Sequence, residues 1–261
     1  MNTSNNDNHE ISAGYIISQT MFFISENFRT LFTYALMIGI VSTMGTVAVK
    51  LAGASVLRGI FISIINVYVG IITTIMMIKV IDCTFNNEEF NIGGLLEFAN
   101  SRFWKVLGIG ILAGLCIVIP TVVVALIYVY SHSIVFNIIF GILLSIPGVY
   151  VLALFMFIRI MPVVEDLDQQ TVGLSDCVAV VKHNIKTVVA LTLFSILVGV
   201  PIYVVTFIGT RFNLNPVMIT SISAVLSMVI TPLIVSVDYI AYRNIKAKMD
   251  DETRALEGSV V

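Results

Sequence analysis

Charged residues are scarce in this chain of 261 residues. Asp, Glu, Lys and Arg make up 11% of the sequence and hydrophobic residues 58%, and the formal net charge is -2. A soluble domain carries about 25% charged residues, so this chain has too few charges to cover a surface in water. The composition indicates a membrane protein and excludes a disordered chain, a collagen-like fibre and a basic nucleic-acid-binding protein.

Motifs for metal binding and catalysis are also lacking. Cys83, Cys116 and Cys177 form no Cys-x-x-Cys pair, which excludes a disulfide-stapled module and predicts reduced thiols. The three histidines have no metal-ligand spacing, and the sequence has neither a glycine-rich phosphate loop nor a Gly-x-Ser-x-Gly motif. We therefore expect no metal site, no cofactor and no catalytic centre.

Runs without any charged residue, in contrast, are long. A membrane-spanning helix needs about 20 apolar residues, and five charge-free runs reach that length. The run 106–158 would be about 80 Å long as one helix, so it must fold back, and the polar residues 131–133 predict the turn. The sequence predicts an all-α, polytopic transmembrane bundle with six spans in three hairpins, at about 31–49, 57–79, 106–129, 135–159, 187–209 and 217–240.

The distribution of basic residues predicts the orientation. Lys50, Arg58 and Arg211 lie on one side of the predicted bilayer, and the other eleven Lys and Arg lie on the side of both termini. The positive-inside rule therefore predicts cytoplasmic termini in the cell membrane. We expect a single membrane domain over 1–261, with a disordered tail at 1–10 and a cytoplasmic tail at 248–261. The first 28 residues contain no Lys or Arg, which argues against a secretory signal peptide.

Three segments of the chain resemble one another, at about 11–82, 90–165 and 172–247. Gly45, Pro120 and Pro201 occupy the same position in the first span of each segment, where proline kinks a helix and glycine permits bending or close packing. An amphipathic stretch precedes each of these spans, which predicts helices lying along the cytoplasmic interface. The alternatives are a chance coincidence of common residues and simple cytoplasmic extensions of the spans.

The second inner loop carries a recognisable order of residues. Pro162 and Glu165 are followed by a helix with Leu174, Lys182 and Asn184. This order resembles a bacterial six-span group that includes the membrane domain associated with glycerophosphodiester phosphodiesterases and related uncharacterised families. In that group a proline and an acid precede an Ala-Leu-x-x-Ser-x-x-Leu-x-Lys-x-Asn helix. The chain departs from the pattern at Gly173, Cys177 and Val180.

The resemblance implies an all-helical, non-catalytic membrane domain. The phosphodiesterase activity of that group belongs to a separate soluble barrel of well over 200 residues, for which this chain has no room. The resemblance therefore does not transfer the enzyme, although a complex with one stays open.

Asp238 is the only acid within a predicted span. A carboxylate in that position costs several kcal/mol unless it is paired or hydrated, so Asp238 is the leading candidate for a proton or cation pathway. However, Arg243 follows five residues later, near the interface. We favour a structural role in which Asp238 pairs locally or reaches the interface.

The sequence thus favours a non-catalytic accessory or structural protein, a subunit of a membrane transport or lipid-related system. Its expected partners are the lipid bilayer and a membrane or cytosolic protein, and not nucleic acid. The alternative is a small-solute or lipid transporter or channel. A transporter should depend on Asp238 or on the kinks at Pro120 and Pro201, whereas an accessory protein should depend on its inner loops and tail.

Overall fold

The computed structural model describes residues 11–51, 56–131, 148–154, 156–164, 174–212 and 214–258. Almost all of these residues are helical, and none of them forms a strand. The predicted all-α fold is confirmed for this part of the chain. The helices are α1 (Ala13–Leu51), α2 (Val56–Phe85), α3 (Ile92–Ser131), α5 (Met161–Val164), α6 (Leu174–His183), α7 (Ile185–Arg211) and α8 (Pro216–Gly258). An apolar helical segment, Gly148–Val164, ends in α5.

Local signals explain where several helices begin and end. The side-chain oxygens of Ser12 and Asn91 accept hydrogen bonds from backbone N–H groups in the first turns of α1 and α3, which are otherwise unpaired. Pro216 is the first residue of α8, where its missing N–H costs nothing. After α2, Asn87 adopts a positive φ of 55°, a conformation that asparagine tolerates better than most residues.

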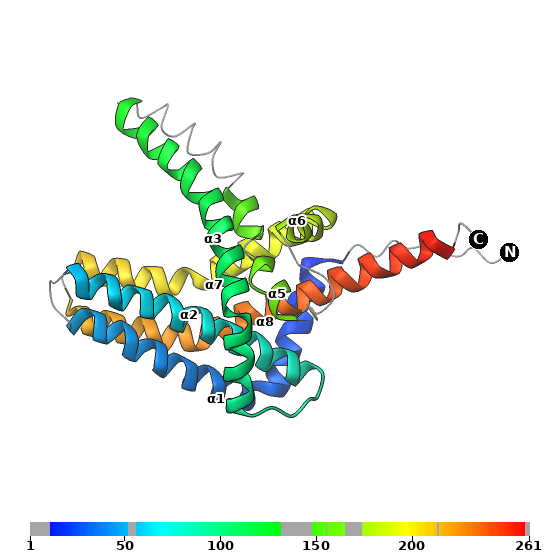
Figure 1. Ribbon diagram of the computed structural model, residues 1–261, viewed down its shortest axis with the longest axis horizontal. Helices are drawn as coiled ribbons and strands as arrows, with labels where there is room; N and C mark the ends of the chain where they lie inside the picture. The colour runs from blue at the N-terminus through cyan, green and yellow to red at the C-terminus, as the bar shows by residue number, and fades with distance from the viewer. Residues whose placement is uncertain are drawn as a thin grey trace.

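Four helices run side by side along the long axis of the molecule (Figure 1). α1 packs against α2 and α8, and α7 packs against α8. α1 and α7 end, and α2 and α8 begin, at the left of Figure 1, which we call the hairpin end. The opposite end, where α2 finishes and α7 starts, is called the polar end. α8 is the central helix of the bundle because it contacts α1, α2, α6 and α7.

α3 takes a different course from these four helices. It crosses them, and its second half projects away from the bundle (Figure 1). Only α2 and α5 pack substantially against α3 among the described elements. The predicted turn of this second hairpin falls on residues outside the described part of the chain.

Within the described part of the chain, three helices are long and apolar enough to cross a membrane, namely Val67–Phe85 of α2, all of α7, and Met218–Ala255 of α8. Gly148–Val164 is apolar but shorter. Large apolar side chains cover the outside of α7, where Leu197, Tyr203 and Phe207 are 68%, 75% and 71% exposed. Helices of this kind, with apolar side chains facing outward, indicate a membrane protein. Six spans in three hairpins stay a prediction.

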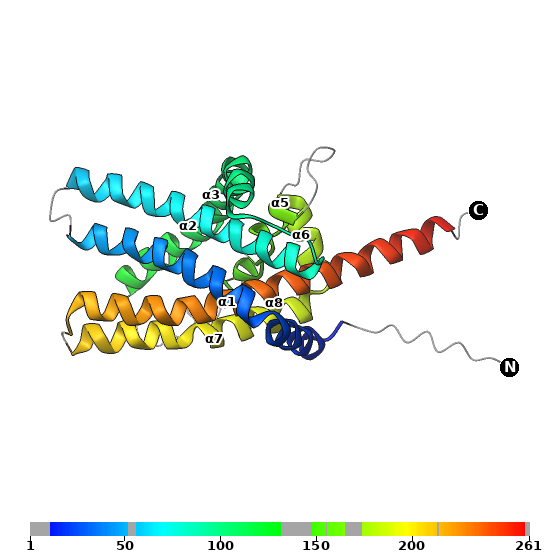
Figure 2. The same ribbon diagram turned by 90° about the horizontal axis from the view of Figure 1, so that it is seen from below.

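The three amphipathic stretches differ in how they join the following helix. In α1 and α3 the stretch and the predicted span form one continuous helix, although the first turns of α1 lie across the bundle axis (Figures 1 and 2). α6 is a separate helix, divided from α7 at Asn184. The geometry therefore varies among the three segments of the predicted repeat.

Candidate functional site

Asp238 is buried near the middle of α8, and its side chain is only 1% exposed. Its Oδ2 accepts a hydrogen bond from Nη2 of Arg159, which lies on the Gly148–Val164 segment. The structure therefore pairs Asp238 with Arg159 rather than with the nearby Arg243. The partner comes from a different predicted hairpin, 79 residues away in sequence.

The Arg159–Asp238 contact uses only one atom of each group. Nε of Arg159 and Oδ1 of Asp238 are both buried and have no hydrogen-bond partner within the described structure. Guanidinium and carboxylate groups frequently pair through two parallel hydrogen bonds, and these two atoms are the ones that a second bond would use. The ion pair thus leaves one buried donor and one buried acceptor unsatisfied.

A second acid, Asp82, is 9% exposed and lies on α2 within the candidate span Val67–Phe85. Its Oδ1 accepts a hydrogen bond of 2.7 Å from the Tyr239 hydroxyl, and its Oδ2 lies 2.8 Å from Nζ of Lys79. Asn86 Nδ2 donates to the same Oδ1 at 3.2 Å. The predicted second span ends at Lys79, whereas α2 continues to Phe85, so the described structure contains a second buried acid beside Asp238.

Asp238 and Tyr239 are adjacent in α8 but reach two different predicted hairpins. Asp238 binds Arg159 of the second, and Tyr239 binds Asp82 of the first. We call Lys79, Asp82, Arg159, Asp238 and Tyr239 the buried polar cluster. Its side chains connect three parts of the chain that are far apart in sequence, and α8 supplies the connection.

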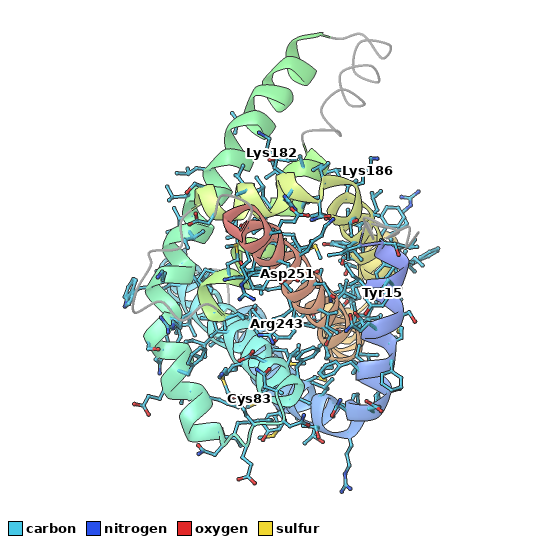
Figure 3. All side chains as sticks on the ribbon, turned by 90° about the vertical axis from the view of Figure 1, so that its right-hand side faces the viewer. Tyr15, Cys83, Lys182, Lys186, Arg243 and Asp251 are labelled. Atoms are coloured by element: carbon cyan, nitrogen blue, oxygen red, sulfur yellow. The ribbon has the colours of Figure 1, made fainter. Side chains whose placement is uncertain are left out.

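Phe85 extends the cluster toward the polar end. Its ring lies 5.8 Å from Phe23 of α1 and 5.7 Å from Tyr239 of α8, measured between centroids. The Arg243 guanidinium lies 5.6 Å from the Phe85 ring, a cation–π distance. Figure 3, which looks onto the polar end, shows Arg243 near the centre, with Lys182 and Lys186 along one edge and Asp251 on α8.

Further polar contacts join α8 to its neighbours closer to the surface. Asn244 Nδ2 donates to Gln19 Oε1 of α1 at 3.0 Å. His183 Nε2 of α6 lies 3.0 Å from Glu252 Oε2, and both side chains are partly exposed. The polar end of α8 is therefore joined to α1, α2, α6 and the Gly148–Val164 segment.

The residues of the resemblance are spread over this end of the molecule. Pro162 is buried in α5, Lys182 is exposed on α6, and Glu165 lies outside the described residues. Asn184 precedes α7 without a side-chain capping bond, and its buried Nδ2 has no partner in the described structure. Of these residues, the described ones, Pro162, Lys182 and Asn184, do not belong to the buried polar cluster.

The predicted kink residues are distributed over three helices. Pro201 lies within α7 and is exposed, whereas Gly45 in α1 and Pro120 in α3 have surroundings outside the described residues. Sequence reasoning overlooked Pro232, which is buried within α8. Pro232 lies six residues before Asp238, so the central helix carries a helix-weakening residue close to its ion pair.

The arrangement offers charge pairing and proton acceptance rather than metal chemistry. Among the described residues, no group of three or more His, Cys, Asp and Glu side chains could hold a metal ion. Cys83 and Cys177 are buried, and neither forms a disulfide within the described structure. The buried polar cluster is the candidate functional site because it holds both buried acids of the described structure.

No protein-family model, curated protein or solved structure matches this chain.

Proposed function

We propose that this protein is a non-catalytic accessory or structural subunit of the cell membrane, with six spans and cytoplasmic termini, that serves a membrane transport or lipid-related system. The proposal rests on one observation: both buried acids form polar contacts that join different helices. Asp238 binds Arg159, and Asp82 binds Tyr239 and Lys79. Groups engaged in this way hold a scaffold together.

The polar end supplies the surface for a partner. The last turns of α8 extend beyond the bundle, and Asp250, Asp251 and Glu252 are exposed there (Figure 1). Lys182 and Lys186 are exposed on the neighbouring helices. A surface with both signs of charge suits recognition of a cytosolic protein or of the cytoplasmic part of another membrane protein, because charge complementarity gives specificity.

The test is purification of the tagged full-length chain in mild detergent, followed by mass spectrometry of the proteins and lipids that accompany it. We expect a stoichiometric membrane or cytosolic protein. The double variant Asp250→Lys/Asp251→Lys should lose that protein. A matched control, Arg211→Glu at the hairpin end, should retain it.

A small-solute or lipid transporter is the second candidate, and the unsatisfied atoms of the Arg159–Asp238 pair favour it. Transporters place ionisable groups within their spans to bind substrates and protons. Purification of the chain alone as a defined oligomer with a bound solute, and solute flux into vesicles that is lost in Asp238→Asn, would overturn the accessory proposal in favour of transport.

A further inference from the structure

The two halves of the Arg159–Asp238 ion pair differ in their access to the surroundings. The Asp238 side chain is 1% exposed, whereas the Arg159 side chain is 34% exposed. An arginine at this depth can extend its guanidinium toward the interface while its alkyl stem stays in apolar surroundings. Asp238 has no such route, because its short side chain sits on the central helix.

Protonation of Asp238 would therefore have an unequal effect on the two partners. A neutral carboxyl group can stay buried without a charged partner, but the partly buried guanidinium of Arg159 cannot stay in place without cost once its carboxylate is lost. The unpartnered Oδ1 is the atom that would accept the proton, and the unpartnered Nε of Arg159 lies on the other side of the same contact. A water between the two atoms would deliver that proton if it receives one from solvent at the polar end as it gives its own to Oδ1, so that it remains a neutral water.

Arg159 lies on the Gly148–Val164 segment, and its neighbours Phe157, Ile158 and Ile160 are buried in the apolar core. The segment shares an apolar core with α8, in which the Phe157 ring contacts Tyr242. Its polar contacts with α7 and α8 are the ion pair and a weaker one from the Thr192 hydroxyl to Met156 Sδ at 3.9 Å. Loss of the ion pair would thus weaken the polar attachment of this segment to α8.

We propose that Asp238 is a proton-binding site and that proton binding releases Arg159 from Asp238, so that the Gly148–Val164 segment shifts against α8 within the apolar core that they share. The ligand is a proton that enters from the polar end. The inference goes beyond the proposed function and does not rest on it, because either an accessory subunit or a transporter can contain such a site.

Other titratable groups at this end come from three helices. Asp82 and Lys79 face Tyr239 from α2, His183 faces Glu252 from α6, and Arg243 follows on α8 itself. α1 contributes the uncharged Gln19, and the buried side chains of α7 beside this region are uncharged. A test must therefore separate Asp238 from Asp82 and His183.

The experiment measures the distance between two spin labels in the full-length protein in nanodiscs. The native cysteines are replaced by alanine, and labels are placed on Leu152→Cys and Val225→Cys, which are 45% and 60% exposed. At about pH 8 we expect one narrow distance distribution, and at about pH 5 a second population at longer distance. Asp238→Asn, which mimics the protonated state, should show that second population at both pH values.

Two matched variants serve as controls. Asp82→Asn and His183→Gln should keep the pH response of the parent protein, because neither removes the proposed proton acceptor. The charge-swapped variant Asp238→Arg/Arg159→Asp should restore the narrow distribution at high pH. A distribution that is identical at both pH values would overturn the proposal, and so would a pH response that persists in Asp238→Asn.

A second measurement does not depend on the folding of a variant. Infrared difference spectra of the unlabelled protein between the two pH values should contain the carbonyl stretch of a newly protonated, buried carboxylic acid. Specific ¹³C labelling of aspartate should shift this band. Absence of a shifted band over the pH range of the distance change would also overturn the proposal.

Discussion

The two ends of the helical bundle are held together by different interactions. At the polar end, Asp238 and Tyr239 of α8 reach Arg159 and Asp82 on other helices. At the hairpin end, α7 and α8 approach so closely that a Cβ atom on Gly209 would collide with Ile219, and the hydroxyl groups of Thr206 and Ser223 lie 3.4 Å apart. Apolar helices gain little free energy from leaving lipid to contact one another. The choice of partner helix must therefore come from polar contacts or from close packing. Polar ties select the partner helix, whereas close packing depends on shape alone.

Removal of Arg159 should have the largest effect, because it leaves Asp238 buried without its partner. We expect Arg159→Met to lower the free energy of unfolding by about 3 kcal/mol at neutral pH. The loss should shrink as the pH falls, because a protonated carboxyl group needs no cation. Equilibrium unfolding in mixed micelles, followed by circular dichroism, measures both effects.

The double variant Arg159→Met/Asp238→Asn is the control for this prediction. It removes both charges, so most of the lost stability should return. A single variant as stable as the parent protein, or a double variant less stable than the single one, would show that the ion pair does not hold the polar end together.

Crowding at the hairpin end should have the next largest effect. Gly209 is buried, and added side-chain atoms would meet the Ile219 side chain from the first turn of α8. We expect Gly209→Val to destabilise the protein by about 2 kcal/mol, measured in the same micelles.

Gly108→Val is the matched control, because a Cβ on Gly108 would meet nothing within 4 Å. It should leave stability nearly unchanged. Equal losses for both glycine variants would indicate a general effect of valine in helices rather than close packing of α7 on α8.

The hydrogen bond from Tyr239 to Asp82 should contribute less than the ion pair. Tyr239→Phe removes the 2.7 Å bond but leaves Asp82 in contact with Lys79 and Asn86. We expect a loss of about 1 kcal/mol. Tyr203→Phe is the control, since Tyr203 is 75% exposed, and it should change stability very little. A loss of similar size in both variants would contradict a specific role for the Tyr239 hydroxyl.

The sequence predicted the helices better than the contacts between them. Charge-free runs gave α7 within two residues at each end, because composition and length determine a span. The same rule set the end of the second span at Lys79 and so placed Asp82 outside it. The spacing of Lys79 and Asp82, three residues apart on a helix, was a local signal that the helix could continue with its charges paired.

The Arg159–Asp238 pair had no local signal. The sequence shows that bases close the even-numbered predicted spans, but it does not show which base faces which acid. Arg243 is closer to Asp238 along the chain, and yet the structure places Arg243 over the Phe85 ring and Arg159 against Asp238. Long-range packing decides this choice, and periodicity within one helix carries no information about it.

The contact between His183 and Glu252 tests whether charge alone, or charge together with burial, allows a polar contact between helices to stabilise the protein. It joins α6 to α8 at 3.0 Å, but the two side chains are 32% and 49% exposed, so water and salt screen it. We expect His183→Gln to cost about 0.5 kcal/mol, and less at high salt. Unfolding measured at low and high salt gives this comparison, with Arg159→Met as the salt-insensitive reference. If the His183 variant loses as much stability as the Arg159 variant, the polar end owes its strength to the number of its charges and not to the burial of Asp238.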